Sequence, residues 1–158
     1  GSSPGSLIIE SGDLILTDSS VLKMDIAGPT PGLSYDQILV GGDLFIDGLL
    51  TLDFFSFTQP AVDTTYDLIH VAGSIIGDWS SFNDIQFLNP FTDFDPSLLG
   101  FSIVESSVTG YDKALRLTIA GIDGPAPGPV TNAVPEPASA LLVGLGGLAI
   151  LTRRRRHQ

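Results

Sequence analysis

The sequence has 158 residues, with 7 lysines and arginines, 18 aspartates and glutamates, two histidines and no cysteine. This length suits one modest domain with accessory segments, and the lack of cysteine excludes disulfides, cysteine-ligated zinc and thiol nucleophiles. Residues 1–133 hold 17 acidic residues against 3 basic ones, and this net charge of −14 repels phosphates and argues against nucleic acid as a partner.

The first six residues contain no initiator methionine, no basic segment and no apolar stretch long enough for a signal peptide. We expect the chain to be the C-terminal part of a longer precursor. A mature start after signal cleavage is the alternative.

Between Leu7 and Ala120 the apolar residues come in short runs broken by Gly, Asp, Ser or Pro, without a sustained period of 3.6. This pattern predicts an acidic all-β module over residues 1–120. Alternation of polar and apolar residues, as in 21–26 and 50–54, predicts half-buried strands. The predicted strands are 7–10, 13–16, 21–26, 37–40, 44–46, 49–57, 66–71, 74–76, 85–88, 101–105 and 114–119.

An internal repeat links two parts of this module. Residues 12–16 (Gly-Asp-Leu-Ile-Leu) recur as 42–46 (Gly-Asp-Leu-Phe-Ile), and 22–25 (Leu-Lys-Met-Asp) recur as 50–53 (Leu-Thr-Leu-Asp). Two architectures fit the repeat. One is a β-solenoid-like stack, in which each unit covers the apolar face of the previous one, and the other is a β-sandwich built from hairpin pairs.

His70 is the only histidine in this module. Strict alternation along 66–71 puts His70 on the same face as Tyr66 and Leu68. No nucleophile or orienting acid is indicated near it, so we predict a structural histidine and no catalytic residue.

Two further features suggest ligands, and neither predicts a site. Residues 144–149 match a dinucleotide fingerprint, but too few residues follow for the helix and second strand that it requires. Asp93 and Asp95 form the tightest acidic pair, yet known calcium-loop spacings are absent. We therefore expect no metal and no cofactor.

The aromatic residues allow a second function for the module. Trp79 lies near several phenylalanines, among them Phe54 and Phe82, and such side chains could form a carbohydrate- or ice-binding surface. Aromatic residues at alternating strand positions are more often core, which is the interpretation we favour.

The composition changes after Ala120. Residues 121–133 form a Pro/Gly-rich spacer, because three prolines there prevent a helix or a central strand. An uncharged run follows at 138–152, which we predict to be one transmembrane helix. Four arginines stop it and set its topology: Arg153, Arg154, Arg155 and Arg156. The positive-inside rule places them in the cytoplasm and the acidic module on the other side of the membrane.

The tail at 134–158 combines Val-Pro-Glu-Pro, a glycine-containing apolar span and a terminal arginine run. It resembles the PEP-CTERM sorting signal of exopolysaccharide-producing Gram-negative bacteria, which has also been labelled an ice-binding protein C-terminal domain. The resemblance implies exosortase as the processing partner and Pro135, Glu136 and Pro137 as the recognition residues. It also implies a body in the periplasm, tethered to the inner membrane and later released to the cell surface or secreted.

The body is more weakly similar to autotransporter-like β-repeat proteins, through its Gly-Asp-Leu turns and residues 35–40 (Tyr-Asp-Gln-Ile-Leu-Val). That similarity favours the solenoid. We expect an exported, non-enzymatic surface or matrix protein, with exopolysaccharide as a further partner. The alternatives are a carbohydrate- or ice-binding module and the accessory C-terminal region of a secreted hydrolase.

Overall fold

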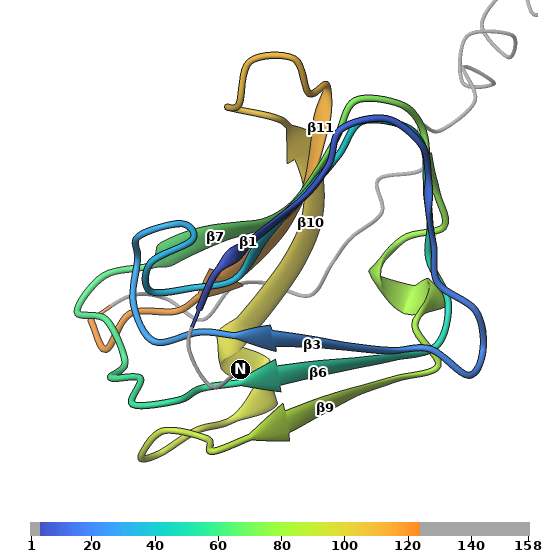
Figure 1. Cartoon of the computed structure of the whole chain (residues 1–158). Coiled ribbons are helices and arrows are strands. Elements are labelled where there is room, and N and C mark those ends of the chain that lie inside the picture. Colours follow the sequence, from blue (N-terminus) through green and yellow to red (C-terminus); the bar gives the residue numbers. More distant parts are fainter. Residues whose placement is uncertain (1–3, 124–158) are drawn as a thin grey trace, which may run out of the picture.

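The computed structural model describes residues 4–123, which fold into eleven strands and two 3-10 helices (Figure 1). The strands are β1 (Ser6–Ile9), β2 (Leu14–Ile15), β3 (Val21–Asp25), β4 (Gln37–Val40), β5 (Leu44–Phe45), β6 (Leu49–Asp53), β7 (Thr64–Val71), β8 (Ile75–Ile76), β9 (Asp84–Leu88), β10 (Leu99–Glu105) and β11 (Lys113–Ile119). The 3-10 helices are η1 (Trp79–Ser81) and η2 (Pro96–Leu98). Every predicted strand is present and the all-β prediction is confirmed, but β6 ends at Asp53 and not at Phe57 as predicted, because residues 54–57 form a turn in which the Phe57 amide donates to the Phe54 carbonyl.

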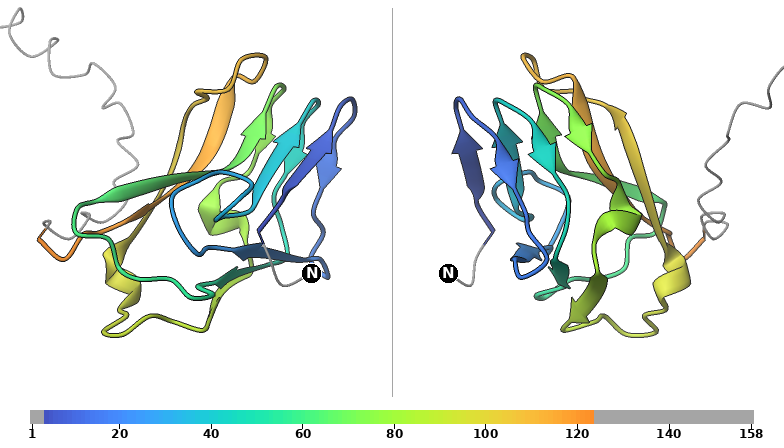
Figure 2. Two further views of the ribbon diagram at one scale, coloured as in Figure 1. Left: turned by 60° about the vertical axis from the view of Figure 1, so that its left-hand side comes forward. Right: turned by 90° about the vertical axis from the view of Figure 1, so that its right-hand side faces the viewer.

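The first nine strands form three turns of chain stacked along one axis, which we call coils 1, 2 and 3. Each coil contributes three consecutive strands, and equivalent strands of successive coils pair in parallel. The resulting sheets have the orders β1-β4-β7, β2-β5-β8 and β3-β6-β9. Figure 1 looks along the axis with coil 1 in front, and Figure 2 shows the coils side by side. This parallel pairing corresponds to the stacked alternative and not to a sandwich of hairpins.

The Gly-Asp repeat forms the corner between the first two strands of coils 1 and 2, and Gly73-Ser74 forms it in coil 3. The Asp43 amide donates to Oδ1 of Asp13 at 2.8 Å, and the Ser74 amide donates to Oδ1 of Asp43 at 2.7 Å. A Cβ atom at Gly42 or Gly73 would collide with the backbone of the preceding coil. The repeat therefore encodes both the close approach of the coils and the hydrogen bond between them.

The core fills the space enclosed by the three sheets. Alternate strand residues point into it, so that Leu50 and Leu52 of β6 are almost completely buried. Aromatic rings extend the core past the ends of β6 and β9, where the ring centroid of Phe54 lies 5.5 Å from those of Phe57 and Phe91.

The hairpin of β10 and β11 closes the stack behind coil 3. β11 pairs antiparallel with both β7 and β10, which makes a five-stranded sheet of order β1-β4-β7-β11-β10. Leu115 and Leu117 of β11 are fully buried. The ring of Phe101 on β10 lies 4.8 Å from that of Trp79, whose Nε1 donates to the Ser102 carbonyl at 2.9 Å.

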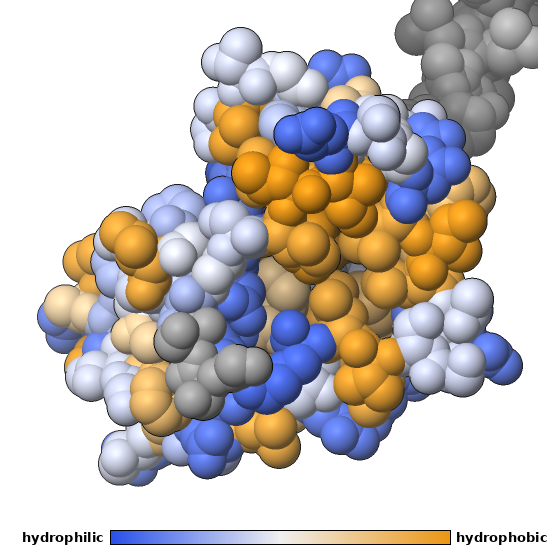
Figure 3. Space-filling view, viewed as in Figure 1, coloured by the Kyte–Doolittle hydropathy of each residue, from blue (hydrophilic) through white to orange (hydrophobic). Residues whose placement is uncertain are grey.

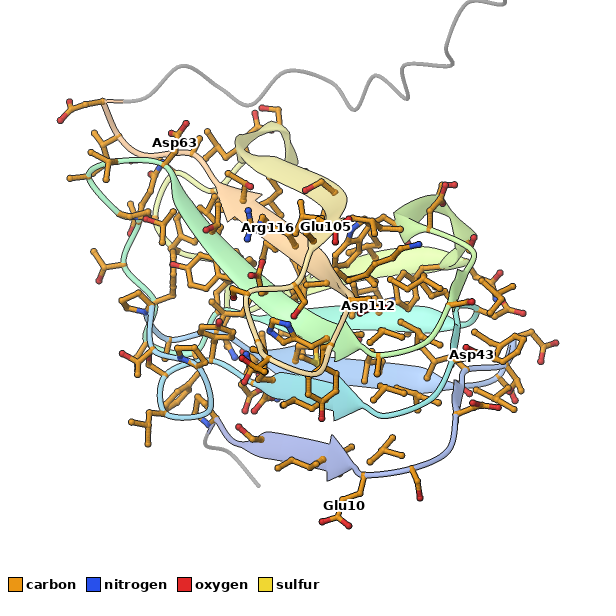
Figure 4. All side chains as sticks on the ribbon, turned by 90° about the horizontal axis from the view of Figure 1, so that it is seen from above. Glu10, Asp43, Asp63, Glu105, Asp112 and Arg116 are labelled. Carbon is orange, nitrogen blue, oxygen red and sulfur yellow. The ribbon has the colours of Figure 1, made fainter. Side chains whose placement is uncertain are left out.

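The chain leaves β11 through residues 121–123, which hydrogen-bond to the segment before β7. The Gly121 amide donates to Oδ1 of Asp63 at 2.9 Å, and the Ile122 amide donates to the Pro60 carbonyl at 3.0 Å. Figure 4 shows Asp63 beside this exit. Residues 121–123, predicted as the start of the spacer, are thus fastened to the β body.

Strand β7 differs from the prediction because it contains a bulge. Leu115 pairs with Ile69 and Arg116 pairs with Asp67, so Leu68 is an extra residue that shifts the alternation. Ile69 belongs to the core, and His70 therefore lies on the opposite, outer face of the sheet. The prediction that His70 shares a face with Tyr66 was wrong, since strict period-two alternation does not survive a bulge.

Candidate functional site

A cluster of charged side chains joins coils 1 and 2 on the outside of the β3-β6-β9 sheet. Asp25 and Asp53 are neighbours in the parallel ladder of β3 and β6, and both are largely buried. The Nζ atom of Lys23 lies 2.6 Å from Asp25 Oδ1 and 2.7 Å from Asp53 Oδ2. The Asn89 amide group donates to Asp53 Oδ1 at 2.7 Å. Lys23 therefore offsets the repulsion between two stacked carboxylates.

The protonation states of this Lys23 cluster follow from its hydrogen bonds. Those from Lys23 to Asp25 and then to Asp53 raise the pKa of Lys23 to about 12. The hydrogen bond from Lys23 also lowers the pKa of Asp53. The lysine stays charged and paired at neutral pH, which suits a structural clamp and not a proton-transfer group.

His70 is buried beneath the loop that connects β10 and β11. Its Nε2 atom lies 3.0 Å from the Gln37 Nε2 amide nitrogen, and its Nδ1 atom lies 2.8 Å from Ser106 Oγ. The ring of Tyr111 packs against it with a centroid distance of 6.3 Å. Desolvation by burial lowers the pKa of His70, with Asp67 opposing this shift and Arg116 adding to it.

The tautomer of His70 is assigned from its partners. With the Gln37 amide nitrogen facing Nε2, that ring nitrogen accepts, and the ring proton is assigned to Nδ1, which faces Ser106 Oγ. A serine nucleophile needs a neighbouring nitrogen that accepts its proton. In this assignment the nitrogen facing Ser106 carries the proton, and the hydrogen bond joins β7 to the loop after β10.

A bidentate ion pair lies on the outer face of β7 and β11. Arg116 Nε and Nη2 donate to the two carboxylate oxygens of Asp67 at 2.6 and 2.9 Å. Figure 4 shows Arg116 on β11, between its neighbours in the five-stranded sheet. The pair fixes the register next to the bulge.

One member of the acidic pair that suggested calcium, Asp95, has a structural partner. Asp95 caps η2 by accepting the Ser97 amide hydrogen at 2.8 Å, which lowers the pKa of its carboxyl. Within residues 4–123, no group of three His, Asp or Glu side chains comes together in a way that could hold a metal ion. An open cleft of about 580 Å³, lined by Phe57, Phe91 and Asp93 among others, lies beside the chain exit.

The aromatic residues considered as a ligand surface are mostly core. Trp79 is 9 % exposed and its indole nitrogen is already hydrogen-bonded. Phe54 and Phe82 are also buried, as the favoured interpretation predicted, whereas Phe55 is exposed. The named residues therefore do not form a carbohydrate- or ice-binding surface.

The predicted sorting residues, Pro135 to Pro137 and Arg153 to Arg156, lie outside the described residues, as does the predicted helix at 138–152. In the part of the chain that the structure describes, no helix has the length and hydrophobicity to cross a membrane.

Comparison with known proteins identifies one segment of the chain. Residues 133–156 match the family model of the PEP-CTERM protein-sorting motif. The chain carries a PEP-CTERM motif. The match contains the Pro-Glu-Pro element and all four arginines, and it supports an exported surface protein of Gram-negative bacteria that is sorted by exosortase.

No curated protein matches the chain, and no solved structure matches it either. The likeness of the body to autotransporter-like repeats therefore stays a prediction. Sequence analysis missed the Lys23 cluster and the partners of His70, because both join residues from different coils or strands. One signal was available: Asp25 and Asp53 occupy the same position in the repeat, so stacking brings them together.

Proposed function

We propose that this chain is the sorted end of a non-enzymatic protein of the cell surface or extracellular matrix, which exosortase processes at its tail. The observation that carries the proposal is the PEP-CTERM match at 133–156. In this proposal Pro135, Glu136 and Pro137 are the recognition residues. The run 138–152 crosses the inner membrane, and the β body lies in the periplasm before it reaches the surface or is secreted.

The physical chemistry of the tail supports this arrangement. As a helix, fifteen uncharged residues would span about 22 Å, and arginine side chains that extend to the headgroups, together with local thinning, would make up the difference from a hydrocarbon core of roughly 30 Å. Pro135 and Pro137 favour an extended backbone, which a membrane enzyme could bind as a strand. The arginines stay on the cytoplasmic side by the positive-inside rule.

The body supports a non-enzymatic role through the way its polar groups are used. Lys23 is held between two carboxylates, and both ring nitrogens of His70 are hydrogen-bonded, to Gln37 and to Ser106. Both groups join separate strands. We propose that the body is a scaffold on the cell surface or in the matrix, where exopolysaccharide surrounds it.

The proposal is tested by expressing the full chain behind a secretory leader, in strains with and without exosortase. We expect a shortened product at the surface or in the medium only when exosortase is present. In its absence, we expect a full-length product in the inner membrane. A full-length product in both strains contradicts the proposal.

Two variants separate recognition from membrane insertion. Glu136→Ala should block processing and leave the protein in the membrane fraction. Replacement of Arg153 to Arg156 by serine should weaken retention in the membrane and allow the tail to insert in the opposite orientation. Protease protection in spheroplasts would reveal the change of orientation. Glu105→Ala, on the exposed end of β10, is a matched control that should be processed normally.

A further inference from the structure

The two ends of the stack differ in what covers them. At the coil 3 end, β11 pairs with β7 and Phe101 of β10 packs against Trp79, but β1, β2 and β3 have no strand beyond them within residues 4–123. Leu7, which points inward, is 54 % exposed there. Ile8, Ile15 and Val21 of coil 1 are also exposed, but they occupy the outward-facing rows of β1, β2 and β3. Figure 3, which looks onto this end, shows apolar side chains in the space bounded by β1, β2 and β3.

Leu7 shows that this end is an interrupted core. It aligns with Ile38 of coil 2 and Ile69 of coil 3, which are 5 % and 2 % exposed. The three residues occupy one inward-facing row. Only the member in coil 1 lacks a covering layer, and the row ends in solvent.

The contacts between the existing coils show what such a layer has to supply. Leu14 donates to the Asp43 carbonyl at 2.9 Å, and Leu44 donates to the Ser74 carbonyl at the same distance. The Asp13 carboxylate accepts the amide hydrogen of Asp43, and the Asp43 carboxylate accepts that of Ser74. Each coil thus offers the next one the same set of partners. The Asp13 amide itself has no hydrogen-bond partner within residues 4–123.

We propose that the open end of coil 1 is a docking surface for one further coil of the same Gly-Asp-apolar repeat, supplied by the preceding part of the same polypeptide. Its strands would extend the three parallel sheets at β1, β2 and β3. Its aspartate would accept the Asp13 amide hydrogen, and its apolar row would cover Leu7. The surface is continuous with the two coil interfaces that the structure already contains.

A second copy of the chain fits this surface less well. Two open ends that meet about a two-fold axis run their strands antiparallel, so no carboxylate of the copy falls in register with the Asp13 amide. Two bodies that each carry a net charge of −14 over residues 1–133 also repel one another.

The capacity of the end to accept a coil is tested with a tandem variant that contains residues 6–36 twice in succession within the full chain. Wild type and variant are reconstituted singly in phosphatidylcholine nanodiscs and compared by amide hydrogen exchange. In the variant, the amides of the original β1, β2 and β3 become those of an inner coil. We expect their exchange to slow by about tenfold or more, because opening them then requires the added coil to leave.

Two matched variants keep the test specific. The tandem chain in which the added coil has its copies of Leu7, Leu14 and Leu22 replaced by serine should show no slowing. Replacement of only the added copy of Asp13 by alanine should reduce the slowing at the Asp13 amide more than at β3. Unchanged exchange in the first tandem variant, with the added coil open to protease, overturns the proposal.

Two further results test what occupies the open end and where that segment comes from. Slow exchange at β1 to β3 in wild type, together with dimers by mass photometry, would show a second copy on this surface and overturn the proposal. In the gene, we expect a Gly-Asp-apolar segment upstream of Gly1. Its distance from Gly12 should equal the distance from Gly12 to Gly42, which is the spacing of the existing repeat. An upstream sequence without a strand-forming repeat would also overturn it.

Discussion

The closed and open ends of this stack consist of similar residues in different settings. At the closed end, Leu117 of β11 is fully buried beside β7 of coil 3. At the open end, Leu7 points along the same core and stays half-exposed. The difference teaches that in a stacked fold the contribution of a leucine depends on the number of layers around it, and not on its strand pattern.

The largest expected effect comes from matched leucine truncations at the two ends. Leu117→Ala removes fully buried contacts and should lower the free energy of unfolding by about 2–5 kcal/mol, whereas Leu7→Ala should cost less than about 1 kcal/mol. Urea unfolding followed by the fluorescence of Trp79, the only tryptophan, measures both. Equal losses would show that Leu7 is already covered.

The second prediction concerns the clamp that holds coil 1 to coil 2. Lys23→Met leaves Asp25 and Asp53 stacked without a cation and should destabilise the protein by about 1–3 kcal/mol. Adding Asp53→Asn should recover part of this loss, since it removes the repulsion. Unfolding of the single and double variants gives the coupling energy. No recovery in the double variant would contradict the role assigned to Lys23.

A smaller effect is expected at the two Gly-Asp corners. Asp43→Ala removes the acceptor for the Ser74 amide, and Asp13→Ala removes the acceptor for the Asp43 amide. Each loss should cost about 0.5–1.5 kcal/mol. Hydrogen exchange should show faster opening at the amide that lost its acceptor. Asp84→Ala, whose carboxylate bonds only within its own strand segment, serves as a surface control.

The smallest effect is the pH dependence of the closed end. The pKa of His70 is lowered in the folded protein from its ordinary value of 6.5, so the unfolded chain binds a proton first as the pH falls. The stability that the neutral ring contributes is present above about pH 6.5 and decreases below it, until the folded ring also titrates. Asp67 and Arg116, which are hydrogen-bonded to each other, face this site.

His70→Gln should remove this dependence. Unfolding free energies of wild type and variant, measured between pH 5 and 8, should differ most at the upper end of the range. A wild-type free energy of unfolding that increases as the pH falls from 8 to 5 would contradict the burial of a neutral His70 ring.

Local pattern in the sequence was enough to predict every strand, because short apolar runs between Gly and Asp corners suit β structure. The recurrence of 12–16 as 42–46 left both a stack and a sandwich of hairpins open, and in the structure equivalent strands pair in parallel register. The bulge at Leu68 could not be predicted, since it depends on how β7 meets β11. The partners of Lys23 and His70 lie on other strands, and only folding brings them close. The sorting motif needed no fold at all, because it is read from adjacent residues.

The place of β11 in the sheet has a mechanical consequence. The tail continues from a strand that is flanked on both sides, by β7 and by β10, and residues 121–123 are fastened beside it. Tension applied through a membrane tether would enter the body at this strand. The force would act on the hydrogen bonds of β11 to both β7 and β10. The whole sheet would therefore resist it, and no single edge strand would detach.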